Sequence, residues 1–439
     1  MLKNIIKNIN SIIFLLRAGL IIGTELLVYT LFRDYSLFID RITMRLASLN
    51  ILYVKVFQAF ALNNSLIDDR INNNLLKFTD NAPWNFSDIN LQELVEIAEQ
   101  YNLHLPHGYE KPINSGMISL VFKASKKDNF NEKVIIKMKR KNIQAKLDEA
   151  IDNLLFSMYI LSFIPIINKY QLAEVVTKNI EIIRHQTNFI EEVENMHRIA
   201  ENCKYLKYVK IPKADREVTE KYPNVILMEY IEGIKINQIK EEDYNGFAKQ
   251  IVKFGIVTTI LHGVTHGDLH SGNILFIKDT NDIKYPYKIG VIDFGIIHDL
   301  EKQNKGLIFD ILTKIFEVSP RESSVKLLSI IIEPKGILEQ IPKEHYNNII
   351  AFTEEIISET INTTKKANQI QIYKFISKLK EYLSKKELMN IGIRPSDEFV
   401  KSQLVLAMAH GVTLTLCKGD FITLMDTCLN ELFQTEMLF

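Results

Sequence analysis

Three oxygen-bearing side chains, each next to a strand-like run, constrain the fold of this sequence most. Asp268 and Asn273 lie five residues apart in the segment HGDLHSGN, and Asp293 follows 25 residues after Asp268 in the segment IDFG. The runs ILFI after Asn273 and YKIGVI before Asp293 have the apolar, β-branched character of strands. If these two runs pair as a hairpin, Asn273 and Asp293 come to the same edge of a sheet.

The chemistry of these side chains fits a magnesium–phosphate site. A carboxylate and an amide are oxygen ligands suited to a hard divalent ion such as Mg²⁺, which also holds phosphate oxygens. A second carboxylate nearby can orient a nucleophile or accept its proton. The same division of roles occurs in kinase-type phosphoryl transfer, where a lysine also binds phosphate.

The two histidines of the same segment are interpreted as structural. His266 and His270 have the i, i+4 spacing of a zinc pair, but that spacing builds a site only on a helix, and Gly267 and Gly272 favour a loop. We expect His266 to brace the backbone. His270 is either a structural residue of the loop or a neighbour of phosphate, and we favour the structural role.

A phosphate-binding lysine is expected on an upstream strand. Lys137 fits because it ends the apolar run of VIIKMKR, whereas Lys133 and Lys139 suit an exposed edge. A lysine inside a cleft needs an acidic partner. The helical stretch FIEEVENMHRIAEN offers three glutamates, and Glu192 lies beside its apolar face, so we expect Glu192 to reach Lys137.

The loop expected to cover the phosphates is poor in glycine. Kinases commonly place three glycines there, whereas PINSGMISLVFKA contains only Gly116. Ser115, Gly116 and the backbone of Met117 would then cover the nucleotide.

The bulk composition narrows the class of protein. A chain of 439 residues suffices for two lobes and an extension. Lysine plus arginine and aspartate plus glutamate both total 53, so the zero net charge disfavours a nucleic-acid partner. Three cysteines without a CxxC pair indicate an intracellular reducing compartment and give no support to zinc. They are Cys203, Cys417 and Cys428.

The order of strand-like and helical segments predicts an α+β fold with two lobes. The expected elements are helices over 1–50 and 51–80, a helix capped by Ser87 or Asp88, strands at 118–125 and 133–140, helices over about 143–202, a strand at 224–233, a helix ending near Gly263, a strand at 287–295, and helices after Asp299.

The N-terminus reads as a basic amphipathic helix. No acidic residue precedes Glu25, and the apolar residues Ile5, Ile9, Ile12 and Leu16 recur at helical spacing. Contact with a membrane surface, an organelle-targeting role and docking on the protein's own body are the readings left open. A spanning helix is ranked below them because Arg17 and Glu25 interrupt the apolar run.

Together these motifs resemble the UbiB/ADCK family of atypical kinases. VIIKMKRKNI resembles the family's V-A-V-K-V-Q-R-P-G-I, PINSGMISLVFKA its P-x-x-x-x-S-I-G-Q-V-x-x-A loop, and NFIEEVEN its D-F-x-x-E-A-x-N helix. HGDLHSGN and VIDFG match its catalytic and metal motifs. The stretch beginning YVKVFQAFAL resembles its F-I-K-L-G-Q-A-L-S-T-R signature, an element that ordinary protein kinases lack.

The resemblance implies a two-lobed protein-kinase-like fold with a helical N-terminal extension and a mostly helical C-lobe. The expected parts are an N-terminal helical segment at 1–50, which membrane association would use, a family-specific helical extension over the cleft at 51–110, an N-lobe with a helical insertion at 111–232, and a C-lobe at 233–439.

It also implies a function and a set of roles. Members of this family bind ATP with Mg²⁺, show ATPase or unorthodox kinase behaviour, and support ubiquinone or other isoprenoid-lipid metabolism at membranes. The expected partners are a nucleotide, a lipid or membrane surface, and proteins that stay unidentified. The implied residues are Lys137 as the strand lysine, Glu192 as its partner, Asp268 as the catalytic-loop aspartate, Asn273 and Asp293 as Mg²⁺ ligands, Met228, Glu229 and Tyr230 as the adenine-side hinge, and Lys55 and Gln58 in the signature.

The sequence departs from the family pattern around that signature. Phe57 stands where the family has glycine, and Gln186 and Asn188 stand where an E-x-D would pair with Lys55. Lys55 therefore loses its expected acidic partners.

Two alternatives stay open. Small-molecule phosphotransferases of the aminoglycoside or choline kinase type share the loop pattern H-G-D-L-H-x-G-N but lack the extension. A pseudokinase scaffold that never turns over ATP fits the altered signature and the glycine-poor loop.

Overall fold

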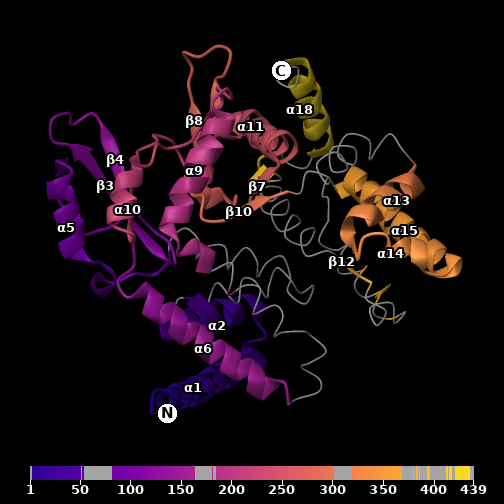
Figure 1. The fold of residues 1–439 in the computed structure, drawn as a ribbon, viewed down its shortest axis with the longest axis horizontal. Coiled ribbons are helices and arrows are strands. Elements are labelled where there is room, and N and C mark those ends of the chain that lie inside the picture. The colour runs from indigo at the N-terminus through magenta and orange to yellow at the C-terminus, as the bar shows by residue number, and fades with distance from the viewer. Residues whose placement is uncertain are drawn as a thin grey trace. The chain divides into compact units, whose positions relative to one another are not determined.

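A computed structural model describes most of the chain as helices and short strands (Figure 1). It describes residues 2–50, 52–53, 82–163, 180, 184–300, 319–367, 379, 382–383, 385, 393–395, 412–413, 415–417 and 421–435. The chain divides into two compact units, with Met1–Glu194 and Lys213–Tyr230 in unit 1 and Asn195–Pro212 and Ile231–Phe439 in unit 2. The division assigns Asn195–Pro212, which the sequence placed in the N-lobe, to unit 2, and the expected domain bounds stay a prediction.

Unit 1 begins with two long helices, as expected for residues 1–50. Helix α1 (Leu2–Phe32) packs against α2 (Tyr35–Leu49) and against α6 (Ile143–Leu161). The side chain of Glu25 is fully buried in α1 and forms ion pairs with Arg41 (2.6 Å) and Arg45 (2.7 Å) of α2. A charge that interrupts the apolar run is thus neutralised by the neighbouring helix.

The sheet of unit 1 is antiparallel and carries the strands expected at 118–125 and 133–140. Its order is β1–β3–β4–β6, and β2 pairs with the far end of β3. Helix α5 contributes Leu94 and Ile97 to a core that also contains Phe122 and Ile136 of the sheet. The elements are α5 (Leu91–Gln100), β1 (Leu103–His104), β2 (Asn114–Ser115), β3 (Ser119–Lys126), β4 (Lys133–Lys139), α10 (Arg216–Lys221) and β6 (Val225–Glu229).

The start of α5 corrects one expectation. Ser87 and Asp88 do not cap this helix; they belong to the 3₁₀ turn η1 (Phe86–Asp88), and Asn90 is the N-cap residue. The reason is electrostatic, because the Asp88 carboxylate is buried beside Arg140 at 2.8 Å and Lys146 at 2.9 Å.

Unit 2 is built around a hairpin and one helix. Strands β8 (Ile274–Lys278) and β9 (Tyr287–Val291) pair antiparallel, and β5 (Val209–Lys210) adds to β9 in parallel. Helix α11 (Tyr244–Ile256) packs on β9 and continues as the π-helix η4 (Val257–His262). Gly263 caps it with φ +65°, so the C-cap expected at this glycine is confirmed.

Four short elements complete this part of unit 2. They are η2 (Ile236–Gln238), η3 (Glu241–Asp243), β7 (Val264–His266) and η5 (Ser271–Asn273). A further strand, β10 (Ile297–Asp299), pairs with β7 and was not expected from the sequence.

The segment after Asp299 is mainly helical where it is described, as expected. Two short strands, β11 (Ile332–Glu333) and β12 (Arg394–Pro395), interrupt it as an antiparallel pair. Glu431 joins the last helix to α11 through ion pairs with Lys249 (2.8 Å) and Lys253 (2.7 Å). The helices are α13 (Pro320–Ile331), α14 (Ile337–Gln340), α15 (Lys343–Ala367) and α18 (Phe421–Thr435).

Two glycines of α11 predict opposite responses to alanine. A Cβ on Gly246 would lie 2.5 Å from the Tyr287 ring, which a hydrogen bond to Asp243 holds in place, whereas a Cβ on Gly255 would meet nothing within 4 Å. We expect Gly246→Ala to lower the free energy of unfolding by roughly 1–3 kcal/mol. The control Gly255→Ala should raise it by up to about 1 kcal/mol. Denaturant unfolding measures both, and equal effects would contradict this packing.

Candidate active site

The β8–β9 hairpin brings two of the three oxygen-bearing residues together at one edge. Ile274 pairs with Val291, and the Ile292 N–H donates to the Asn273 carbonyl at 3.1 Å, so the ladder ends with Asn273 opposite Ile292, the residue before Asp293. The Asn273 side-chain amide donates to the Asp268 carbonyl at 2.8 Å. This bond uses the Nδ2 atom and leaves Oδ1 as the acceptor of the amide. Asp268, Asn273 and Asp293 are thereby linked through the backbone.

His266 braces this edge through a neutral imidazole. Its Nδ1 accepts from the Asp268 N–H at 3.1 Å, so the ring proton lies on Nε2, which donates to the Asp293 carbonyl at 2.5 Å. Burial lowers the pKa of His266 below 6.5, although the nearby Asp293 opposes this. One ring therefore ties the loop at Asp268 to the segment at Asp293.

His270 and a lysine brace the loop from the other side. The Nδ1 atom of His270 accepts from the Gly272 N–H at 3.1 Å, and its Nε2 lies 3.7 Å from the Asp268 carboxylate. Lys235 donates to the Gly272 carbonyl at 2.9 Å. The structural role favoured for His270 agrees with this geometry, whereas Lys235, whose ammonium donates to a backbone carbonyl, carried no sequence signal.

In unit 1, Lys137 and Glu192 form the ion pair suggested by the apolar face of the glutamate-rich helix. The Lys137 ammonium lies 2.5 Å from the Glu192 carboxylate, and their side chains are 8% and 2% exposed. Lys137 is on β4, between β3 and β6, and Glu192 is on α9 (Phe189–Cys203). Lys139 is half-buried against the Phe189 ring, so the expectation of an exposed edge lysine is wrong for it.

Asn188 has a local role at the start of α9. Its side-chain oxygen accepts from the Glu191 N–H at 3.3 Å, and its backbone carbonyl accepts from the Glu192 N–H at 3.0 Å. An asparagine in this place is a good N-cap residue. The departure from the family's E-x-D therefore still serves the helix that carries Glu192.

The glycine-poor loop is held tightly by protein groups. The Ser115 hydroxyl donates to the Ala82 carbonyl at 2.7 Å, the Gly116 N–H donates to the Ser119 carbonyl at 2.8 Å, and the Met117 side chain is buried. The Ser115 hydroxyl and the Gly116 N–H are thus engaged, and the expected cover of a nucleotide by these residues stays a prediction.

The expected adenine-side hinge ends strand β6. Met228 lies between Ile135 of β4 and the bridge residue Ala214, and the Glu229 N–H donates to the Lys213 carbonyl at 2.9 Å. The Tyr230 ring receives the Lys123 ammonium at 4.0 Å from its centroid. The hinge role of these residues stays a prediction.

Helix α9 serves both units. Glu192 pairs with Lys137 in unit 1, and three residues later Asn195 donates to the Phe294 carbonyl of unit 2 at 3.3 Å. Phe294 is the third residue of the IDFG segment and follows Asp293. Asn195 is the last residue of the stretch NFIEEVEN, and the family helix that this stretch resembles ends in the same asparagine.

The signature residues Lys55, Phe57 and Gln58 lie outside the described residues, as does all but 52–53 of the helices expected over 51–80. Among the residues that are described, no three His, Cys, Asp or Glu side chains are grouped as a metal site. Asn273 and Asp293 nevertheless carry side-chain oxygens of the kind that Mg²⁺ accepts, and their role as its ligands stays a prediction. An ion held by this pair would need further oxygens, which phosphate groups would supply.

Comparisons with known proteins identify relatives of more than half of the chain. A family model described as the ABC1 atypical kinase-like domain matches residues 79–323. A chloroplastic protein of Arabidopsis thaliana, named Activity of BC1 complex kinase 8, is 23% identical over 258 residues, which are 57% of this chain and 33% of that protein. A probable protein kinase UbiB of Blochmanniella pennsylvanica is 26% identical over 296 residues, which are 65% of this chain and 52% of that protein.

These matches cover only part of each relative, a third of the first and about half of the second. Among solved structures, a Mycobacterium tuberculosis protein in complex with erythromycin aligns at a TM-score of 0.45 and 14% identity, over 82% of this chain and 87% of that one.

The neutral His266 predicts that stability depends on pH. The folded protein lowers the pKa of His266 below 6.5, so the unfolded chain binds this proton more tightly. The free energy of unfolding should therefore fall as the pH drops below 6.5, and His266→Gln should reduce that slope. Denaturation at several pH values measures it. The control His107→Gln, at an exposed ring, should keep the wild-type slope. A wild-type slope in His266→Gln as well would contradict the role of a neutral His266.

Proposed function

Because this chain belongs to the ABC1 atypical kinase-like family, which includes the UbiB/ADCK kinases, we propose that it binds Mg-ATP and acts as an atypical kinase or ATPase. Family membership and the two units support the expected α+β kinase-like fold with a helical N-terminal extension. The observation that carries the proposal is the pairing of β8 with β9, which ends with Asn273 beside the residue before Asp293.

The chemistry follows from the position of each group. Asn273 Oδ1 and the Asp293 carboxylate would hold Mg²⁺, which would neutralise charge on the phosphates when bound. Asp268 would orient the nucleophile or accept its proton, within a loop that His266 and His270 hold rigid.

Lys137 would bind phosphate as the cation of unit 1. The buried Lys137 ammonium is oriented by its ion pair with Glu192. Ser115, Gly116 and Met117 would cover the phosphates, and Met228 to Tyr230 would line the adenine side.

A nucleotide-binding pseudokinase scaffold is the second candidate. The tight hold on Ser115 and Gly116 favours it, because these groups already bond within the protein. Single-turnover release of phosphate from ATP, measured with membranes present, separates a scaffold from an enzyme.

We further propose action at a membrane in isoprenoid-lipid or quinone metabolism. One relative is named chloroplastic and another is named UbiB. Helix α1 exposes a row of apolar side chains, among them Leu16 at 69% and Leu27 at 65%. By length and composition Asn8–Phe32 could cross a bilayer, a test that core helices and signal sequences also pass, and 17% of that window is buried. The basic Lys3, Lys7 and Arg17 suit an anionic surface.

Asp293→Asn tests the nucleotide proposal. Mg-ATP at a hundred times its Kd should raise the free energy of unfolding of the wild type by about 2.7 kcal/mol. Asp293→Asn should lose this stabilisation because a neutral amide binds Mg²⁺ poorly. Thermal unfolding with and without Mg-ATP measures it. Asp299→Asn, at a 67% exposed carboxylate of the same unit, is the control and should behave as the wild type. Full stabilisation of Asp293→Asn would refute the site.

The membrane proposal is tested on the apolar row of α1. Sedimentation with vesicles of mixed zwitterionic and anionic lipid should recover the wild type. Leu16→Glu combined with Leu27→Glu should weaken vesicle binding roughly tenfold or more, since each leucine would otherwise enter the apolar phase. Ile283→Glu, at a 95% exposed side chain in unit 2, is the matched control. Equal binding of the double variant and the control would exclude α1 as the contact.

A further inference from the structure

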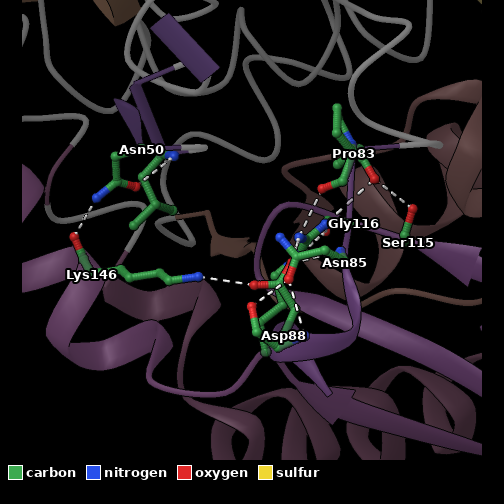
Figure 2. A network of polar contacts seen from close by, with 11 residues as sticks. Asn50, Pro83, Asn85, Asp88, Ser115, Gly116 and Lys146 are labelled. Carbon is green, nitrogen blue, oxygen red and sulfur yellow. Dashed lines mark hydrogen bonds and ion pairs between the residues drawn. The ribbon is translucent and has the colours of Figure 1, made fainter. Parts of the chain in front are cut away.

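Arg140, the residue after β4, is buried with as many hydrogen bonds as its guanidinium has N–H groups. Its side chain is 2% exposed. Nε and Nη2 donate to the Gly116 carbonyl at 3.0 and 2.7 Å, Nη1 donates to the Pro83 carbonyl at 2.9 Å and to Asp88 at 2.8 Å, and Nη2 donates to the Ala82 carbonyl at 3.4 Å. Figure 2 labels three of these acceptor residues, Pro83, Asp88 and Gly116. Four of these five bonds end on backbone, so Arg140 fixes the path of two loops.

Asp88 holds the guanidinium in place. Its carboxylate accepts from Arg140, from Lys146 at 2.9 Å and from the Asn85 N–H at 3.2 Å (Figure 2). The Asp88 carbonyl also accepts from the Lys141 N–H at 2.7 Å. Arg140 therefore cannot swing away from the Gly116 carbonyl without leaving a buried carboxylate short of partners.

The bond to the Gly116 carbonyl sets the direction of the next N–H. The peptide between Gly116 and Met117 is planar and trans, so the Met117 N–H points opposite to the carbonyl that Arg140 holds. The neighbouring peptide is fixed as well, because the Ser115 carbonyl accepts from the Ala82 N–H at 2.9 Å. The Met117 side chain is 5% exposed and packs with Ala82, which anchors the loop from the same side.

The shape of this loop does not require its glycine. A Cβ on Gly116 would meet its nearest neighbour, the Ser119 carbonyl, at an ordinary 3.5 Å, and the φ of Gly116 lies outside the left-handed region. In loops that bind phosphate, several backbone N–H groups usually point at the ligand because glycines permit it. Here the guanidinium of Arg140, which lies outside the loop in sequence, sets the orientation of the Gly116–Met117 peptide instead.

We propose that Arg140 is a positioning residue for the nucleotide phosphates: by holding the Gly116 carbonyl, it directs the Met117 N–H at a phosphate oxygen. This rests on the proposed binding of Mg-ATP. Arg140 itself touches no ligand in this scheme. Its effect is confined to the phosphate part of the nucleotide, which separates it from a residue that merely stabilises unit 1.

The test compares ligands with and without phosphates. Calorimetry would give the Kd of Mg-ATP and of adenosine for the wild type, Arg140→Lys and Lys146→Met. Lysine keeps the charge beside Asp88 but cannot hold the carbonyls of Gly116 and Pro83 together. Arg140→Lys should weaken Mg-ATP about tenfold, the worth of one lost hydrogen bond to a charged oxygen. Its Kd for adenosine should change by less than about twofold, because no phosphate contact is involved.

Lys146→Met is the matched control, since Lys146 is 41% exposed and bonds to Asp88 but not to the Gly116 carbonyl. Both its Kd values should stay within about twofold of the wild type. Equal weakening of both ligands in Arg140→Lys, or no weakening of Mg-ATP, would overturn the positioning role.

A measurement on the wild type guards against an Arg140→Lys protein that does not fold. Hydrogen exchange of the Met117 amide should slow on binding Mg-ATP and stay unchanged with adenosine. If Mg-ATP binds the wild type but leaves the exchange of the Met117 amide unchanged, the positioning role of Arg140 is overturned. The proposed function would still stand in that case if Asp293→Asn abolishes the binding of Mg-ATP. A wild type that does not bind Mg-ATP would overturn both.

Discussion

The backbone pairing of β8 with β9 is the constraint on which the candidate chemistry depends. In this register Asn273 lies opposite Ile292, so a slip of one residue would change which residue of the IDFG segment lies beside Asn273. The register is fixed by the bond from Ile292 to the Asn273 carbonyl and by His266, which binds the backbone on both sides. Main-chain bonds therefore set the positions of Asp268, Asn273 and Asp293 along the chain.

Two buried cations, one within β4 and one just after it, are each paired with a carboxylate from a distant segment. Lys137, inside the strand, is matched by Glu192, and Arg140, just beyond its end, is matched by Asp88. A buried charge without a partner is strongly destabilising, so each pair forces a distant segment onto the strand. One brings in α9, and the other brings in the loop at 82–88. The strand thereby organises the helix and the covering loop of unit 1 together.

The sequence predicted those residues that helical periodicity or a capping rule marks out. Glu192 could be chosen over Glu191 because it lies beside the apolar face of its helix, and the C-cap at Gly263 followed from a simple rule. Arg140 carried no such signal, since it stands at the end of a basic run and most of its acceptors are backbone carbonyls. Asp88 was misread as a cap because an aspartate before a helix usually is one. β10 was missed because three residues show too little pattern.

Helix α9 limits how this chain can change in length. Glu192 serves one unit and Asn195 the other, and they are less than one helical turn apart. Each residue inserted between them would rotate Asn195 by about 100° around the helix axis while Glu192 kept its lysine. An insertion or deletion within this turn is expected to break one of the two contacts. We therefore expect the spacing of these two residues to be inherited as a fixed unit among the relatives of this chain.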